Sequence, residues 1–126
     1  MVTWILWALI LAMLAWMGFN YLRIRRAAKI VDNEEFEALI RTGQLIDLRD
    51  PAEFHRKHIL GARNIPSSQL KTSLAALRKD KPILLYENQR AQRVTNAALY
   101  LKKRGFSEIY ILSYGLDSWK GKVKTS

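Results

Sequence analysis

Cysteine is absent from this chain of 126 residues. Without a thiol the chain cannot form disulfides, build a zinc site from thiolates or carry out thiol catalysis. The absence does not identify a compartment, because cysteine-free proteins occur on both sides of a membrane. It does restrict the chemistry that the remaining residues can perform.

Acidic residues are also missing from the beginning of the chain, where none precedes Asp32. The net charge is +10, which is typical of proteins that contact nucleic acid, an anionic membrane or anionic ligands. Most of the excess is scattered and no basic patch is interleaved with aromatic residues, which disfavours nucleic acid. One basic cluster directly follows an apolar run: Arg23, Arg25, Arg26 and Lys29.

The apolar run from Val2 to Phe19 carries no charge. As a helix it would reach roughly 27 Å, close to the hydrocarbon core of about 30 Å. A cleavable signal peptide normally has basic residues before its apolar region, whereas here they follow it. We therefore predict an uncleaved, single-pass signal-anchor at 1–22, a basic linker at 23–28 and a folded domain at 29–126.

The basic cluster predicts the orientation of this anchor. Lys and Arg beside a membrane span remain in the cytoplasm, so the N-terminus should lie outside and the domain inside the cell membrane. The arginines at 23, 25 and 26 either contact anionic lipid, at about 1 kcal/mol each, or only set the topology. Residues 2–22 would then contact the bilayer.

Strands and helices are predicted to alternate through the rest of the chain. Asp32 before Glu35 is typical of a helix start, and Asp50-Pro51 with Glu53 is another such start. A helix after Ser67 or Ser68 should present Leu70, Leu74 and Leu77. The expected strands lie at 29–31, 45–48, 62–65, 82–86 and 109–112. This order predicts an α/β domain with a five-stranded parallel sheet and helices on both faces.

One strand–loop–helix unit, Pro82 to Arg104, is the candidate site. A loop between a central strand and a helix start points backbone N–H groups inward, where they can hold an anion or a nucleophile. The first residue of this loop is Glu87, a carboxylate. The predicted binding loop comprises Glu87, Asn88, Gln89, Arg90, Ala91, Gln92 and Arg93.

Two stretches resemble signatures of the rhodanese-like (sulfurtransferase) family. DLRDPAEF, from Asp47 to Phe54, is similar to the family's D-x-R-x-x-x-E-[FY]. HILGARNIP, from His58 to Pro66, is similar to G-H-I-x-G-A-x-N-I-P, with Lys57 where glycine is usual. The resemblance covers about 30–124 and implies a rhodanese-like fold after one transmembrane helix. It also implies that Asp47 and Arg49 brace the site loop.

The same resemblance places Glu87 where active members carry the cysteine that takes up sulfur as a persulfide. Arg90 replaces the family's loop glycine, and Gln92 stands at its arginine position, with Arg93 one residue later. A carboxylate cannot hold a sulfane sulfur as a thiol does. The sequence therefore resembles a catalytically inactive member of the family.

Three interpretations of Glu87 remain at this stage. Its carboxylate could occupy the loop N–H groups itself, could be solvated, or could act in catalysis without a second carboxylate or base beside it in sequence. Arg90 and Arg93 could hold an anion or simply pair with nearby acids.

His55 and His58 have no evident third ligand, so no metal site is expected. We predict that His58 bonds a backbone carbonyl near Gly61.

The sequence as a whole favours a membrane-tethered, inactive rhodanese-like domain of bacterial type that acts as a binding or scaffolding module. Its partner would be an unidentified protein or a small anion, with no cofactor and no nucleic acid. The alternative is an enzyme or anion-binding domain that uses the loop from Glu87 to Arg93 on a small anionic ligand.

Overall fold

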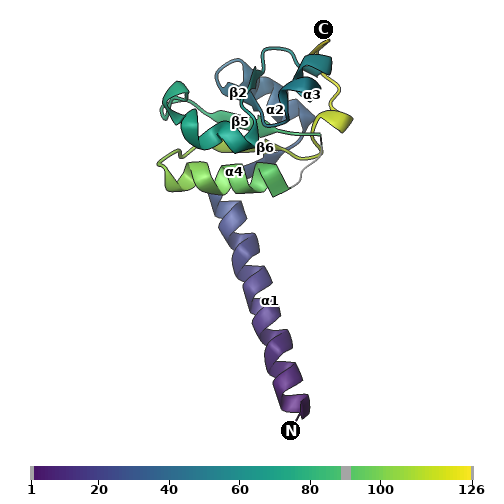
Figure 1. Cartoon of the computed structure of the whole chain (residues 1–126), viewed down its shortest axis with the longest axis vertical. Coiled ribbons are helices and arrows are strands. Elements are labelled where there is room, and N and C mark those ends of the chain that lie inside the picture. Colours follow the sequence, from purple (N-terminus) through teal and green to yellow (C-terminus); the bar gives the residue numbers. More distant parts are fainter. Residues whose placement is uncertain (1, 89–91, 126) are drawn as a thin grey trace.

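The computed structural model describes residues 2–88 and 92–125, apart from the side chains of 23–27. A long helix, α1, projects from a layered α/β domain (Figure 1). The helices are α1 (Val2–Ala27), α2 (Asn33–Ile40), α3 (Pro51–Arg56) and α4 (Gln92–Lys103), with short 3₁₀ helices η1 (Ser67–Thr72), η2 (Leu74–Ala76) and η3 (Leu116–Ser118). The strands are β1 (Lys29–Val31), β2 (Gln44–Asp47), β3 (His58–Ile59), β4 (Arg63–Asn64), β5 (Ile83–Tyr86), β6 (Ile109–Leu112) and β7 (Val123–Lys124).

Five strands form one sheet in the order β1-β6-β5-β2-β4. Every neighbouring pair is parallel, which confirms the predicted five-stranded parallel sheet. β5 lies at the centre, and all four of its residues are buried. A parallel sheet is covered on both faces, so its central strands are apolar throughout rather than alternating with polar residues.

The side chains of β5 alternate between two hydrophobic clusters, one on each face of the sheet. Ile83 and Leu85 belong to the cluster that α4 covers. Leu84 and Tyr86 belong to the opposite cluster, with Phe36 of α2. Phe36 is fully buried, and burying such a side chain contributes about 1.5–3 kcal/mol. The helices therefore cover both faces, as predicted.

Two local predictions were wrong. The segment after Pro66 is not an α-helix but the 3₁₀ helices η1 and η2, which are separated at Ser73. The run is short, and the N–H groups of Ser73 and Leu77 bond three residues back to Leu70 and Leu74. The sequence reading also missed the two-residue strands β3 and β7, which pair antiparallel in a separate small sheet.

The helix α1 is long and apolar enough to cross a membrane. Its apolar part, Val2–Leu22, has a mean hydropathy of 2.0. None of this segment is buried inside the protein, unlike the core helix of a soluble domain. A signal sequence near an N-terminus has the same length and composition, so the helix itself indicates only that a span is feasible.

The two predicted helix caps differ in the structure, and this difference gives a matched test. Asp32 Oδ1 accepts a hydrogen bond from the Glu35 N–H at 2.9 Å, whereas Asp50 makes no side-chain cap bond to α3. Asp32→Ala should lower the free energy of unfolding by about 1 kcal/mol. Asp50→Ala should change it by less than about 0.5 kcal/mol.

The measurement is urea unfolding of the full chain in detergent, monitored by circular dichroism. An equal loss of stability in the two variants would show that the cap at Asp32 contributes nothing specific to α2.

Candidate functional site

The candidate site lies where β2 and β5 leave the sheet side by side. Asp47 at the end of β2 is in register with Tyr86 at the end of β5. Parallel strands bring their carboxyl ends to one edge, where open α/β sheets place their sites. The residues that follow, Arg49 from β2 and Glu87 from β5, are therefore brought together by the sheet.

Glu87 is turned into the protein and is only 8% exposed. Its Oε2 accepts a hydrogen bond from the Val94 N–H at 2.8 Å. Val94 lies in the first turn of α4, where backbone N–H groups have no partner within the helix and attract negative charge. The carboxylate therefore occupies a position at which a helix start would otherwise receive an external anion.

Burial raises the pKa of the Glu87 carboxyl above its ordinary value. The hydrogen bond from Val94 and the charge of Arg93 act in the opposite direction, while Glu53 and Asp47 add to the increase. The net shift is upward, so the environment favours the neutral acid more than water does. The internal carboxylate is thus held in place at an electrostatic cost.

Asp47 and Arg49 form a buried ion pair beside this loop. Arg49 Nη2 lies 2.8 Å from Asp47 Oδ2, and Nε donates to both carboxylate oxygens at 3.0 and 3.1 Å. The Arg49 N–H also donates to Asp47 Oδ1 at 2.9 Å. Burial lowers the pKa of Arg49, but the bonds and charge of Asp47 outweigh it and raise the pKa overall. Arg49 therefore stays charged.

The ion pair reaches the site loop through Asn88. Arg49 Nη1 donates to Asn88 Oδ1 at 3.0 Å, and Asn88 Nδ2 donates to Glu53 Oε2 at 3.2 Å. Arg49 also donates to the Lys57 carbonyl, which follows α3. These contacts join β2, α3 and the loop, which is the arrangement expected if Asp47 and Arg49 brace the site.

A second support, which the sequence reading missed, comes from the turn after β6. Leu116 N–H donates to the Glu87 carbonyl at 2.8 Å, and Asp117 N–H donates to the Asn88 carbonyl at 3.0 Å. Gly115 permits this approach, because a Cβ there would lie 2.4 Å from the Asn88 oxygen and its φ is +70°. Gly115 itself is the only feature of the sequence that could have indicated the contact between this turn and the site loop.

The remaining predicted site residues are placed as follows. Gln89, Arg90 and Ala91 lie outside the described residues. Gln92 Nε2 donates to Asn96 Oδ1 at 2.9 Å along α4, and Arg93 is exposed on the same helix. Their role in binding stays a prediction.

Two aromatic contacts complete the surroundings of the site. His58 Nδ1 is hydrogen-bonded to the Phe54 carbonyl at 2.7 Å, so the predicted partner near Gly61 was wrong. The reason is local. Because α3 ends at Arg56, the Phe54 carbonyl is left without a partner in the helix. The rings of Phe54 and His58 also stack, with their centres 3.8 Å apart. Trp119 is half-buried and packs edge to face against Phe36 at 5.8 Å, so it belongs to the core.

Comparison with known proteins agrees with this geometry. Residues 32–122 match the model of the Rhodanese-like domain family. A relative named "Uncharacterized protein YqhL", from Bacillus subtilis (strain 168), is 47% identical over 113 residues, which cover 90% of this chain and 89% of that protein. A thiosulfate sulfurtransferase, GlpE from Stutzerimonas stutzeri (strain A1501), is 35% identical over 95 residues, which cover 73% of this chain and 84% of that enzyme.

Solved structures share the same fold. A full-length protein from Lactobacillus plantarum superposes with a TM-score of 0.71 at 23% identity, covering 91% of this chain and 98% of that one. A rhodanese-like domain protein from Staphylococcus aureus gives a TM-score of 0.69 at 18% identity, covering 78% of this chain and 98% of that one.

The chain belongs to the rhodanese-like domain family, as its motifs predicted. Because it has no cysteine, it cannot form the cysteine persulfide on which sulfurtransferase chemistry depends.

The upward pKa shift of Glu87 makes the stability of the domain depend on pH. The pKa of Glu87 is higher in the folded protein than in the unfolded chain, so ionisation of Glu87 lowers the free energy of unfolding. The stability is fully present below the unfolded pKa of about 4.3, and it is lost as the pH rises through the folded pKa. Glu87→Gln keeps an oxygen acceptor for Val94 but carries no charge. The variant should therefore be more stable than the parent at pH 7, and the two should converge at pH values below the unfolded pKa.

Thermal unfolding across this pH range measures the difference. Glu37→Gln, which removes the same charge at an exposed position on α2, serves as the control and should show no such convergence. A Glu87→Gln variant that is less stable than the parent at pH 7 would contradict the stated sign.

Proposed function

We propose that this protein is a membrane-tethered rhodanese-like domain that lacks sulfurtransferase activity and serves as a binding module. The observation that carries this proposal is the hydrogen bond from Val94 N–H to the buried carboxylate of Glu87. The domain keeps the family fold, but an acid side chain occupies the place where the resemblance expects a sulfur-carrying thiol.

The surroundings of Glu87 support a binding role over an enzymatic one. A substrate anion at the start of α4 would have to displace a carboxylate that is already bonded there, and would meet its negative charge at close range. The loop is also held by the Arg49–Asn88 and Leu116–Glu87 bonds. A loop start whose described residues, Glu87 and Asn88, are already bonded within the domain suits recognition of another surface better than cycles of covalent chemistry.

The apolar helix α1 supports the membrane tether. Its apolar part ends at Leu22, and the helix continues to Ala27 through the basic positions Arg23, Arg25 and Arg26. Basic residues on one side of a span favour the cytoplasmic side. We therefore place the domain in the cytoplasm, close to the membrane surface, with the N-terminus outside.

The proposal predicts the outcome of a sulfur-transfer assay on the full chain in detergent. In sulfurtransferases a thiolate attacks the outer sulfur of thiosulfate, the S–S bond breaks and sulfite leaves. The parent chain should show no thiosulfate:cyanide turnover and no mass increase by one sulfur atom. Glu87→Cys should gain one sulfur atom on incubation with thiosulfate, because the start of α4 stabilises a thiolate.

Ser107→Cys, which places a thiol at an exposed position away from the site, is the matched control and should remain unmodified. Turnover by the parent chain would refute the inactive assignment. Equal modification of the two cysteine variants would show that the loop offers no special environment.

The tether predicts that the protein stays in the membrane fraction during alkaline carbonate extraction, and that external protease leaves the domain intact in spheroplasts. Leu11→Lys should release the protein, because a lysine at the centre of a span costs about 2.5–3.5 kcal/mol. Asn20→Lys, at the end of the apolar stretch, should not. Extraction of the parent chain, or its digestion from outside, would overturn the tether or its orientation respectively.

A further inference from the structure

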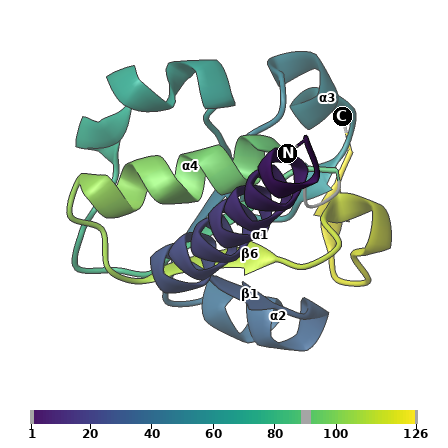
Figure 2. The ribbon, with the colours of Figure 1, turned by 90° about the horizontal axis from the view of Figure 1, so that it is seen from below.

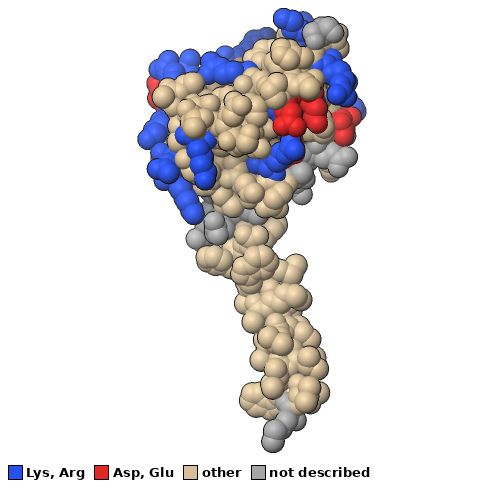
Figure 3. Space-filling view, viewed as in Figure 1, with Lys and Arg blue, Asp and Glu red and all other residues tan. Residues whose placement is uncertain are grey.

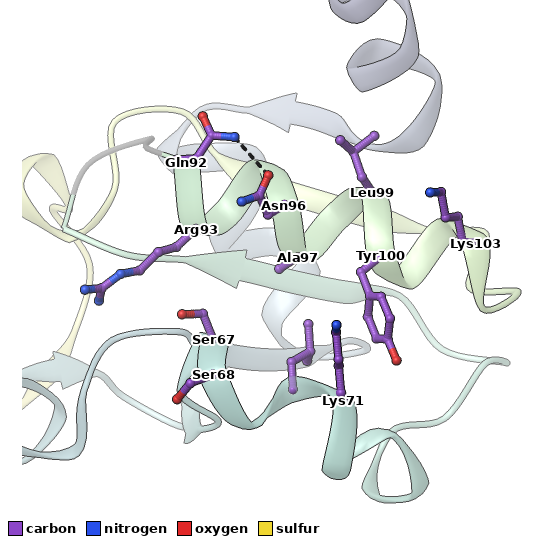
Figure 4. A pocket seen from close by; sticks show the side chains of 11 residues that line it. Ser67, Ser68, Lys71, Gln92, Arg93, Asn96, Ala97, Leu99, Tyr100 and Lys103 are labelled. Atoms are coloured by element: carbon purple, nitrogen blue, oxygen red, sulfur yellow. Dashed lines mark hydrogen bonds between the residues drawn. The ribbon is translucent and has the colours of Figure 1, made fainter.

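A groove between η1 and α4 has no role in the site described above. It has a volume of about 520 Å³. Figure 4 shows that side chains from both elements project into it. Three of its lining residues are basic, namely Lys71 from η1 and Arg93 and Lys103 from α4. The apolar part of the lining is formed by Leu70, Ala97, Leu99 and Tyr100.

The basic residues of this groove form no ion pair within the described part of the chain, although the charge of Arg93 also acts on Glu87. No ion pair joins Lys71, Arg93 or Lys103 to a carboxylate among residues 2–88 and 92–125. Lys71 Nζ instead lies 5.6 Å from the centre of the Tyr100 ring, and Arg104 Cζ lies 5.2 Å from the same ring. The groove thus combines free positive charge with an aromatic and aliphatic wall, which matches an anionic amphiphile.

One wall of the groove, α4, lies next to the anchor. Viewed along the axis of α1 from its N-terminal end, the teal segment that contains η1 lies on the far side of α4 (Figure 2). α4 packs against α1. In Figure 3, Lys and Arg side chains lie on the left of the domain down toward the anchor and also along its top and right, and the larger acidic areas lie at the right.

The distance to the bilayer is short. Beyond the apolar stretch that ends at Leu22, the helix continues only to Ala27, which adds roughly 8 Å. This is about one Debye length at physiological ionic strength, so an anionic membrane surface would still attract basic side chains on this part of the domain, although the attraction is partly screened. The tether therefore keeps the wall of the groove formed by α4 near the lipid headgroups.

We infer that the groove between η1 and α4 binds the phosphate headgroup of an anionic phospholipid from the bilayer that holds α1. This inference rests on the membrane tether proposed above. Lys71 and Lys103 contact the phosphate, Arg93 adds positive charge at the other end of the groove, and Leu99 and Tyr100 contact the glycerol and the first methylenes of the acyl chains. The contact would hold the domain against the membrane in one orientation and leave the edge with Glu87 and Tyr114 free for a partner.

The test uses the full chain in nanodiscs of phosphatidylcholine with increasing mole fractions of phosphatidylglycerol. Hydrogen–deuterium exchange is measured for peptides that cover 67–76 and 92–103. In the parent chain, phosphatidylglycerol should slow exchange in both peptides while α2 is unchanged. A basic residue near an anionic surface is worth about a fivefold change in affinity.

The groove variant carries Lys71→Gln, Arg93→Gln and Lys103→Gln and should need at least about tenfold more phosphatidylglycerol for the same protection. The matched control carries Lys120→Gln, Lys122→Gln and Lys124→Gln. It loses the same charge near the C-terminus, at the end of the domain away from the anchor, and should behave as the parent (Figure 1). Unchanged exchange of α2 in both variants confirms that they fold.

Each other outcome overturns a specific step. Failure of the parent chain to insert into any nanodisc refutes the tether itself. Insertion without lipid-dependent protection, or an equal loss of protection in both triple variants, refutes the groove as the site. Protection by inorganic phosphate in phosphatidylcholine discs, at the same level as by phosphatidylglycerol, shows that the groove takes a free anion rather than a lipid.

Discussion

The site of this protein depends on where one buried negative charge is held. The start of α4 presents backbone N–H groups that no residue within the helix can satisfy, and such a terminus attracts an anion. Here the Glu87 carboxylate, from the end of the preceding strand, accepts the bond from Val94. The pKa of Glu87 is raised because burial, together with the charges of Glu53 and Asp47, outweighs this hydrogen bond and the nearby charge of Arg93. The carboxylate stays inside because the rest of the site leaves it little freedom.

That restriction comes from two neighbouring elements. The buried pair of Asp47 and Arg49 fixes Asn88, and the turn at Gly115 brings two backbone donors onto the carbonyls of Glu87 and Asn88. A buried ion pair is weak evidence for stability, because its desolvation can cancel its attraction. Its value here is geometric: it links β2, α3 and the site loop. The described start of the site loop, Glu87 and Asn88, is thus held in place without a thiol.

Attachment beside α4 changes what the domain can recognise. An exposed helix with Lys102, Lys103 and Arg104 in its last turns would be only a solvated surface in a soluble protein. Packing of α1 against α4 places this helix next to the anchor. The proposed membrane tether would bring the basic residues at the end of α4 close to lipid headgroups, whereas other Lys and Arg residues lie on the opposite side of the domain.

The sequence alone determined the absence of thiol chemistry, the apolar helix and the five parallel strands, because composition and hydrophobic periodicity are local properties. The family motifs around Asp47 and His58 correctly indicated the rhodanese-like family. Other features were decided only by tertiary structure. The 3₁₀ geometry after Pro66, the small β3–β7 sheet, the His58–Phe54 bond and the contact of Gly115 with Asn88 join positions whose pairing no spacing encodes. The inward position of Glu87 likewise required the fold, because a carboxylate enters a protein only where folding brings a donor to meet it.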